Sequence, residues 1–356
     1  MKKKILFCIN DLGFLLSHRS EIILATKNAG YEVLIAYGQA GKVDWDFIKH
    51  NNLKVKNIYM RKGSKKLFTE MICFLHLLLI VKKFKPDIMH LVTVKAYLYG
   101  GIIARILSVP AVVTAIAGLG ILRPDQSLKQ RFFWSIFKRT FAFAMHHKNQ
   151  IIIVQNSSDQ KFLKERDIVT NDRFVLIKGS GVDLSKMLYE PEAEEPVKIT
   201  FCARLLKSKG IYDFIKASQI LKARNYDVDF LVAGEVDEES PDSLIANEID
   251  QLSGSTSVQF LGFVDNVNEL YVKSHIICLP SYYGEGLPKS LIEAAALGRT
   301  IVTTNCPGCA DTVIPGQTGF LVPPKDPEAL AAKLQWLIDN PLQRKNMGKS
   351  AQEFAL

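Results

Sequence analysis

The chain has 356 residues, of which 48% are apolar and 23% charged, a composition that indicates a folded globular protein and excludes a disordered one. This length exceeds what one ordinary core accommodates, so we expect two domains. The longest apolar run, 71–81, is shorter than the about 20 residues of a bilayer span, so no transmembrane helix is predicted.

Short β-branched runs alternate with helical patterns through the first half of the chain. Strands are predicted at 4–9, 32–37, 87–92, 111–115 and 150–154, and helices at 17–29, 67–83, 98–107 and 129–145. Strands that alternate with helices form a parallel, doubly wound sheet.

The segment 190–196 is acidic and contains two prolines, and we interpret it as a linker. The alternation then restarts, with strands at 197–202, 228–233, near 258, 276–279 and 300–303, and helices at 211–223, 243–252, after Glu285 and at 327–338. The predicted fold class is α/β, with two doubly wound, Rossmann-like domains facing a central cleft at the carboxyl ends of the strands, where such folds bind ligands.

Charge divides the chain at the same place. Residues 1–189 carry 30 Lys and Arg against 13 Asp and Glu, a net charge of +17, whereas residues 190–356 carry 15 against 23, a net charge of −8. The split predicts a domain boundary near 190. The basic half suits a diphosphate or an anionic membrane surface. No nucleic-acid-binding motif accompanies it, so no nucleic acid is expected as a partner.

Two segments have the composition of interfacial helices. The run 71–81 is bracketed by lysines, and 131–141 interleaves aromatic residues with cations. Either could dock on anionic lipid. The commoner alternative is a helix that packs one face on the core and leaves its cations in solvent. Six scattered cysteines and a lysine-rich start that leads directly into a strand favour a cytoplasmic protein without a signal peptide.

Charged residues gather near predicted strand ends in the second half. Arg204 follows the strand 197–202, and Lys209 lies in the next loop, so a guanidinium fork and a compact ammonium are available to a diphosphate. Glu285 and Glu293 are eight residues apart, which predicts that they lie on a similar face of one helix, separated by about 12 Å along its axis. That span exceeds the roughly 5–9.5 Å of a glycosidase acid pair and suits an extended polar ligand. The alternatives are a solvated basic loop and an acidic helix start.

The combined motifs resemble glycosyltransferase family 4, whose members are retaining, nucleotide-sugar-dependent enzymes with the GT-B fold. The residues that carry the resemblance are Ala203-Arg204-Leu205 with Lys209-Gly210, Glu285-Gly286-Leu287-Pro288 with Glu293-Ala294, Gly298, and Pro307-Gly308. The match is continuous over roughly 198–335 and looser over 1–190. The segment 178–183 resembles the interdomain hinge of the family.

The resemblance implies a donor site. The donor-binding residues it implies are Gly13, Phe14, Arg204, Lys209, Phe263, Val264, Glu285, Gly286, Leu287, Pro288 and Glu293. Arg204 and Lys209 would hold the diphosphate and stabilise the departing UDP, and Glu285 would hold the transferred sugar, which makes these three the implied catalytic residues. Glu293 would accept hydrogen bonds from the ribose. No metal and no cofactor is implied, because Arg and Lys take the place of a cation.

The segments 282–288 and 307–313 are similar to those of bacterial surface-polysaccharide enzymes. This likeness implies transfer of a hexose or N-acetylhexosamine, best N-acetylgalactosamine in α1,3 linkage, from a UDP-sugar to a polyprenyl-diphosphate-linked saccharide. Residues 1–189 would bind the acceptor and face the inner leaflet of the cytoplasmic membrane as a peripheral protein, and residues 190–356 would bind the donor.

Two features depart from the family. No histidine follows the strand at 111–115, and neither His18 nor His90 is assigned a catalytic role. The chain ends at Leu356, where relatives usually continue with a helix that crosses back to the first domain. The alternatives that remain are a non-catalytic or truncated nucleotide-sugar-binding protein and a UDP-sugar 2-epimerase-like enzyme of the same fold.

Overall fold

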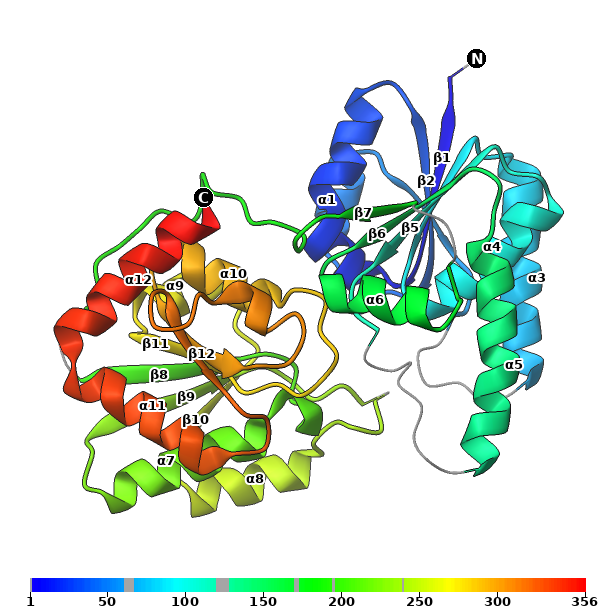
Figure 1. Cartoon of the computed structure of the whole chain (residues 1–356). Helices are drawn as coiled ribbons and strands as arrows, with labels where there is room; N and C mark the ends of the chain where they lie inside the picture. The colour runs from blue at the N-terminus through cyan, green and yellow to red at the C-terminus, as the bar shows by residue number, and fades with distance from the viewer. Residues whose placement is uncertain (1, 61–66, 120–127, 170–172, 194–195, 239) are drawn as a thin grey trace. The chain divides into compact units, whose positions relative to one another are not determined.

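The chain folds into two units, residues 1–180 and 181–356 (Figure 1). The computed structural model describes residues 2–60, 67–119, 128–169, 173–193, 196–238 and 240–356. The division falls between Ser180 and Gly181, ahead of the predicted boundary near 190. Each unit is a doubly wound α/β sheet, as predicted.

The described strands of the first unit form a seven-stranded parallel sheet in the order β3-β2-β1-β4-β5-β6-β7. The strands are β1 (Lys4–Asp11), β2 (Glu32–Gln39), β3 (Lys54–Asn57), β4 (Ile88–Val92), β5 (Ala111–Ile116), β6 (Gln150–Val154) and β7 (Phe174–Leu176). β1 and β4 are almost wholly buried because helices cover both faces of the sheet.

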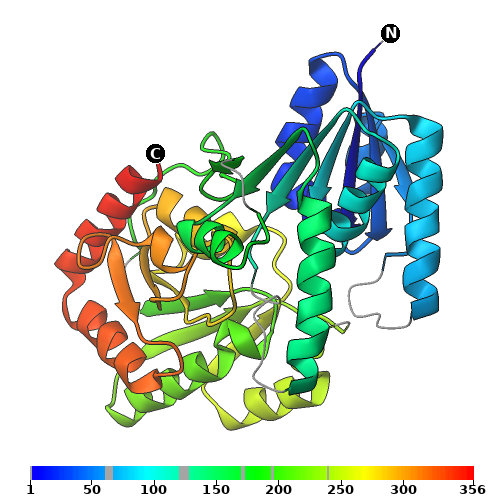
Figure 2. The same ribbon diagram turned by 45° about the vertical axis from the view of Figure 1, so that its right-hand side comes forward.

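The helices of this unit lie in two layers (Figures 1 and 2). They are α1 (Leu12–Asn28), α2 (Trp45–His50), α3 (Leu67–Phe84), α4 (Val94–Ile106), α5 (Leu128–Met145) and α6 (Ser157–Glu165). α1 covers one face of the sheet. On the other face α4 lies between α3 and α5, so α3 and α5 are the two outer helices of that layer.

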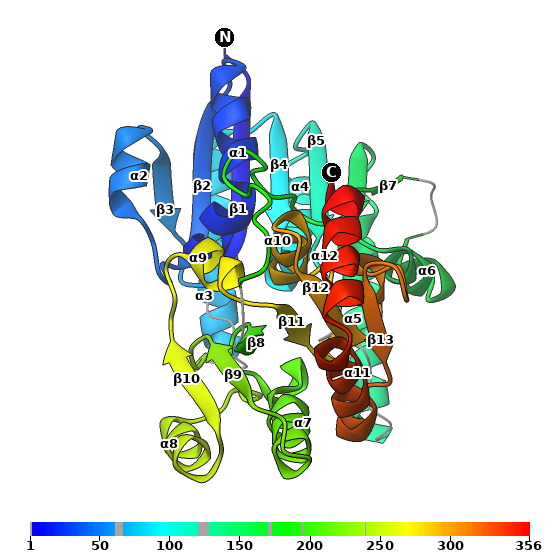
Figure 3. The ribbon, with the colours of Figure 1, turned by 90° about the vertical axis from the view of Figure 1, so that its left-hand side faces the viewer.

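The described strands of the second unit form a six-stranded parallel sheet in the order β10-β9-β8-β11-β12-β13 (Figure 3). The strands are β8 (Val197–Cys202), β9 (Val228–Ala233), β10 (Val258–Gly262), β11 (Ile276–Leu279), β12 (Thr300–Thr304) and β13 (Gly319–Val322). The strand order reverses between β8 and β11, and ligands of doubly wound sheets bind beside such a reversal, at the carboxyl ends of the strands.

The helices of the second unit are α7 (Ile211–Ala223), α8 (Ala246–Ser255), α9 (Val267–Val272), α10 (Lys289–Ala296), α11 (Pro327–Asp339) and α12 (Pro341–Ala355). α7 packs beside α11, and α12 packs on α10 and β12. A core of aromatic rings, Phe201, Phe214 and Phe230, joins β8, α7 and β9, with ring centroids 5.6 and 5.4 Å apart.

The predicted alternation is confirmed, with three kinds of difference. Helix α1 begins at Leu12 and α4 at Val94, ahead of the predicted starts, while α10 begins at Lys289, later than predicted. The helix α12 was not predicted. The remaining unpredicted elements are short or lie at sheet edges: α2, β3, α6, β7, α9 and β13.

The interpretation of 190–196 as a linker is wrong for its described residues, because two of its acidic residues are anchored to the second unit. The Glu192 carboxylate accepts from Arg344 Nε at 3.1 Å, and both side chains are 3% exposed. The Glu190 carbonyl accepts from the buried Arg299 at 2.6 Å. Burial raises the pKa of Glu192, while Arg344 opposes the rise. Among the described acidic residues of the segment, Glu192 thus serves as a buried partner for an arginine from later in the chain.

We expect Arg344→Leu to lower the free energy of unfolding by about 3–5 kcal/mol, because it leaves the Glu192 carboxylate buried without its cation. The double variant Glu192→Leu/Arg344→Leu removes both charges and should recover part of that loss. Chemical denaturation of the three proteins measures both effects. A single variant as stable as the parent would contradict the structural role of this pair.

Candidate active site

The loops that follow β8, β11 and β12 lie at one edge of the second sheet, because parallel neighbours carry their carboxyl ends to the same edge. Backbone hydrogen bonds connect the first two loops. The amides of Tyr282 and Tyr283, after β11, both donate to the carbonyl of Ser208, after β8, at 2.9 and 3.0 Å. The loops after β8 and β11 are therefore hydrogen-bonded to each other at this edge, although they come from separate parts of the sequence.

Lys209 ends a 3-10 turn (Lys207–Lys209) between β8 and α7. The next residue, Gly210, has φ +79°, and a Cβ there would lie 2.1 Å from the carbonyl oxygen of Pro280. Only glycine permits this approach of the β11 loop. The turn directs the lysine ammonium onto Oε1 of Glu285, in an ion pair whose two side chains are largely buried.

Two further side chains complete this arrangement. The Ser281 hydroxyl donates to the same Glu285 oxygen at 2.9 Å, and the Lys209 ammonium lies 5.5 Å from the centroid of the Tyr283 ring. We call Lys209, Ser281, Tyr283 and Glu285 the Lys209–Glu285 cluster. It presents a lysine positioned by the Glu285 carboxylate and the Tyr283 ring, which costs little further ordering when an anion binds.

The prediction that Glu285 and Glu293 lie on one helix is wrong. Glu285 lies in the loop between β11 and α10, and Pro288, with extended backbone angles, precedes the first helical residue, Lys289. Glycines at 284 and 286 and a proline at 288 disfavour helix over this stretch. The helical spacing argument between Glu285 and Glu293 therefore does not apply. Gly286 and Pro288 are buried, and Leu287 is half-buried.

The loop after β12 supports the Glu285 loop from its other side. Gly308 has φ +82°, and a Cβ on it would lie 2.2 Å from the carbonyl oxygen of Gly286 and 2.6 Å from that of Glu285. The Gly308 amide donates to Asp311 Oδ2 at 3.1 Å. The Pro307-Gly308 motif thus acts as packing support for the Glu285 loop.

Arg204 lies in the loop after β8, and its side chain is half exposed. Its guanidinium donates to the mostly buried Asp237 carboxylate, in the loop after β9. Burial raises the pKa of the Tyr283 hydroxyl, and the charge of Arg204 opposes that rise, so Arg204 lies near the Tyr283 side chain of the cluster. The structure thus brings Arg204, Lys209 and Glu285 to one edge.

Glu293 lies on α10, with a mostly buried carboxylate that Lys289 Nζ approaches at 3.3 Å. Burial raises the pKa of Glu293, and Lys289 opposes the rise. Its charge also adds to the effect of burial in raising the pKa of Cys202, at the end of β8, to about 11. Glu293 therefore lies close to the carboxyl end of β8.

Phe263 and Val264 directly follow β10, two strands away from β8. The Gly234 amide, after β9, donates to the Gly262 carbonyl at 2.8 Å, which connects the β9 and β10 loops. Phe263 is exposed and Val264 half-buried. Both lie at the same edge of the sheet as the cluster.

Gly13 and Phe14 belong to the first unit, at the carboxyl end of β1. They lie in the first turn of α1, whereas the prediction placed them in a loop. The Asp11 carboxylate caps this turn by accepting from the Phe14 amide at 3.0 Å. A Cβ on Gly13 would lie 2.4 Å from the carbonyl oxygen of Lys42, so the small residue allows the neighbouring loop to approach.

The same edge of the first unit contains a residue that the sequence did not single out. Thr93, after β4, has φ +81°, a rare backbone state for a β-branched residue, and its hydroxyl donates to Asn10 Oδ1 at 2.8 Å. Such strain is common at functional sites. His90, on β4, is buried, and burial together with Arg19 lowers its pKa to about 3, so its imidazole is neutral.

Sequence reasoning missed four residues of the second unit. The Ser281 hydroxyl donates to Glu285, and the Tyr283 ring lies beside the Lys209 ammonium. The Asp237 carboxylate accepts from Arg204, and the Asp242 carboxylate accepts from the Ser208 amide. The available signal was position for three of them, since Ser281, Tyr283 and Asp237 follow a buried strand by two to four residues, whereas Asp242 lies nine residues after β9. Their partners could not be identified, because they come from other loops.

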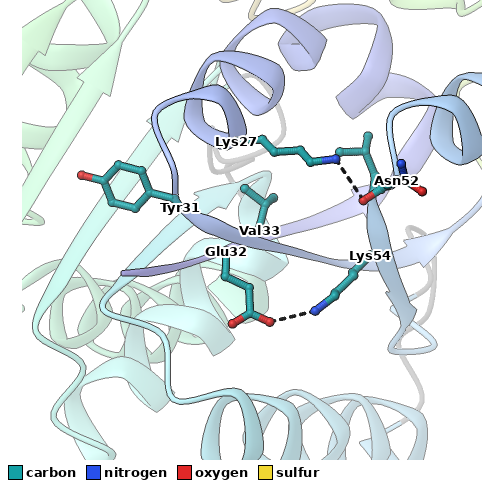
Figure 4. Close-up of a pocket in the computed structure, with 7 residues that line it drawn as sticks. Lys27, Tyr31, Glu32, Val33, Asn52 and Lys54 are labelled. Atoms are coloured by element: carbon teal, nitrogen blue, oxygen red, sulfur yellow. Dashed lines mark hydrogen bonds and ion pairs between the residues drawn. The ribbon is translucent and has the colours of Figure 1, made fainter. Parts of the chain in front are cut away.

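A pocket in the first unit lies away from these edges (Figure 4). Its lining includes Lys27, Glu32 and Lys54, near the amino ends of β2 and β3. Lys54 pairs with Glu32 at 2.8 Å, and Lys27 donates to the Asn52 carbonyl at 3.3 Å. Both lysines of this pocket thus have partners within the first unit. Among the described helices, none combines the length and apolar character needed to cross a bilayer.

Comparison with known proteins gives two family matches. The family "Glycosyl transferases group 1" matches residues 189–354, and "Glycosyl transferase 4-like" matches residues 4–156. Together they span most of the chain and divide it as the fold does.

Two curated relatives and one solved structure illustrate the likeness. N,N'-diacetylbacillosaminyl-diphospho-undecaprenol alpha-1,3-N-acetylgalactosaminyltransferase of Campylobacter jejuni is 26% identical over 352 residues, 95% of this chain and 90% of that protein. UDP-Gal:alpha-D-GlcNAc-diphosphoundecaprenol alpha-1,3-galactosyltransferase of Escherichia coli is 24% identical, over 80% of this chain and 73% of that protein. The fold of Anabaena HepE, solved in complex with UDP-glucose, matches with a TM-score of 0.77 at 17% identity, covering 99% and 94% of the two chains.

The two families, the paired parallel sheets and the loops at the carboxyl edge of the second unit agree with one another. The chain belongs to the glycosyltransferases, with a 4-like first unit and a group 1 second unit, and has the GT-B fold.

Proposed function

We propose that this glycosyltransferase transfers a sugar from a UDP-sugar to a polyprenyl-diphosphate-linked saccharide, with retention of configuration and without a metal ion. The observation that supports it most is the Lys209–Glu285 cluster beside Arg204, at the carboxyl edge of the group 1 unit. An ammonium and a guanidinium at the reversal of a doubly wound sheet match the charge of a nucleoside diphosphate.

Each residue has a distinct proposed task. Arg204 and Lys209 bind the diphosphate and stabilise the negative charge that grows on it as the bond from the anomeric carbon to the β-phosphate oxygen breaks. Glu285, with the backbone at Gly286, Leu287 and Pro288, binds hydroxyls of the transferred sugar. Glu293 accepts hydrogen bonds from the ribose.

Four further residues are proposed as donor contacts. Phe263 and Val264 line the base, and Gly13 and Phe14 approach the diphosphate. An acceptor hydroxyl attacks the anomeric carbon from the face that the diphosphate leaves, which retains the configuration. The hydroxyl proton passes to the departing diphosphate oxygen, so bonds and charges balance.

The acceptor assignment rests on the two curated relatives, whose names both contain an undecaprenyl-diphosphate sugar. It also agrees with the net charge of +17 over residues 1–189, because a diphosphate-linked lipid in an anionic membrane attracts a basic protein. We therefore propose that residues 1–189 bind the acceptor at the inner face of the cytoplasmic membrane. N-acetylgalactosamine in α1,3 linkage is the sugar proposed, after the Campylobacter relative.

Isothermal titration calorimetry of UDP tests the donor site. We expect binding that is the same in EDTA and in Mg²⁺, and at least about ten-fold weaker in Arg204→Ala, since a guanidinium–phosphate contact is lost. Glu293→Ala should weaken UDP binding and leave the thermal unfolding midpoint close to that of the parent. Binding that requires Mg²⁺ would overturn the metal-independent site, and no binding in either buffer would favour a non-catalytic protein.

A further inference from the structure

Helix α3 exposes a row of large apolar side chains. Phe68, Met71, Leu75 and Leu79 are 70%, 51%, 46% and 61% exposed. At 100° per residue these four positions fall within about 80° of arc, in a row roughly 17 Å long. We call them the α3 stripe. Large apolar side chains are common singly at protein surfaces, whereas four on one face of one helix indicate a binding surface.

The stripe is separate from the face that α3 uses for folding. Cys73, Leu77 and Val81 point the other way and are buried in the core of the first unit. α3 is an outer helix of its layer, so the face opposite α4 and the sheet is turned outward (Figure 2). The helix is therefore apolar on two faces, of which only one is needed for packing.

The charged residues of α3 indicate which kind of partner the α3 stripe binds. Glu70, the acidic residue in the sequence of α3, does not lie on the stripe, and its carboxylate accepts from Lys95 Nζ at 2.6 Å and from the Tyr99 hydroxyl. At the other end, Lys82 continues the stripe by helical spacing, and Lys82 and Lys83 are both exposed. An apolar row that ends in lysines matches an anionic bilayer, whose acyl region takes the apolar side chains and whose headgroups take the ammonium groups.

Helix α5 offers less of such a surface over its described side chains. Trp134 packs on Phe137 and Phe162, Phe141 is buried, and Arg105 lies 4.0 Å from the centroid of the Phe143 ring. These aromatic side chains contact other side chains of the same unit. Of the two interfacial candidates in the sequence, the structure therefore favours α3.

We propose that the α3 stripe, with Lys82 and Lys83, docks the first unit on the surface of an anionic lipid bilayer. The stripe would hold the enzyme at the membrane that contains its lipid-linked acceptor, so this inference rests on the acceptor class proposed above. A second copy of the chain is the rival occupant.

Vesicle co-sedimentation of the full chain tests the stripe, with phosphatidylcholine vesicles that contain or lack phosphatidylglycerol. Leu75→Gln/Leu79→Gln should lower the partition coefficient on phosphatidylglycerol vesicles at least about ten-fold. Lys82→Gln/Lys83→Gln should lower it about ten-fold on those vesicles at low salt, and little on uncharged ones. The matched control is Leu188→Gln/Leu342→Gln, two leucines of the second unit that are each 67% exposed, which should bind like the parent.

The proposal fails if the parent does not bind these vesicles, if the α3 pair binds like the parent, or if the control pair loses as much. It also fails if analytical ultracentrifugation shows that the α3 pair breaks a dimer while vesicle binding stays unchanged, because the stripe is then an interface between copies.

Activity separates this inference from the proposed function. With a short-chain, water-soluble prenyl-diphosphate saccharide the α3 pair should match the parent, and with a long-chain acceptor in vesicles it should be about ten-fold slower. A parent enzyme that transfers to neither acceptor would overturn the proposed function. Equal rates of parent and α3 pair on the vesicle acceptor would overturn only the stripe.

Discussion

Replacement of Lys209 by alanine is expected to lower the rate constant of sugar transfer about 10²–10³-fold. The ammonium is held by Glu285 and lies over the Tyr283 ring, so its position is fixed before an anion binds. In the proposed reaction it stabilises charge that appears only as the diphosphate departs, and such interactions affect kcat more than KM. Initial rates of UDP release at saturating donor and acceptor measure the effect.

Lys207 provides a matched control in the same turn. Its ammonium bonds to Glu248 of α8 at 3.1 Å, so Lys207→Ala removes an equal charge two residues away without changing the Lys209–Glu285 cluster. We expect Lys207→Ala to remain within about two-fold of the parent, as exposed ion pairs contribute little. Equal losses in both variants would mean that general positive charge, and not Lys209, matters. Thermal unfolding of both variants checks that they are folded.

Gly308→Ala is expected to weaken UDP binding by more than about ten-fold and to reduce sugar transfer at least as much. The added Cβ would overlap the carbonyl oxygens of Gly286 and Glu285, and both of these belong to backbone, which cannot rotate away as a side chain would. The Glu285 loop must therefore shift, and shifts of about 1 Å in a positioning loop can cost about 10² in rate. Calorimetry with UDP and initial-rate measurements test this.

The Gly316→Ala variant is the control that distinguishes displacement of the Glu285 loop from backbone strain at a glycine with positive φ. Gly316 also has positive φ, +77° against +82°, yet its added Cβ would meet nothing within 4 Å. Gly316→Ala should therefore lose only the roughly 1–2 kcal/mol of left-handed strain and bind UDP like the parent. If the two alanine variants bind UDP equally well, Gly308 does not support the donor site.

The strand pattern could be read from sequence because each central strand is a short apolar run between turn residues. The bounds predicted for β6, β8, β9 and β11 agree with those observed. A central strand of a parallel sheet is buried on both faces, so it requires an apolar run regardless of the sequence elsewhere in the chain. Helix α12 was missed because its sequence is mostly polar, and its packing depends on α10 and β12.

Only those site residues that belong to local sequence motifs could be predicted. Arg204, Lys209 and Glu285 were selected from their motifs, and the structure places them at one edge. The Ser281 hydroxyl on Glu285 and the Asp237 carboxylate on Arg204 depend on loops that approach only after the sheet has formed. The anchoring of Glu192 depends in the same way on Arg344, 152 residues later. Composition predicts a solvated linker there, because an acidic run is usually exposed.

The anchored acidic segment also limits the connection between the two units. The Ile177 amide bonds to Val154 of β6, while Asn268 binds the Lys186 carbonyl and Tyr189 packs against Gly298. The covalent tether is thus confined to a few residues around Gly179 and Gly181, both with positive φ. A tether of this length spans at most about 3.3–3.6 Å per residue. Because glycine adopts positive φ without strain, we expect any other residue at these two positions to strain the backbone of this short connection.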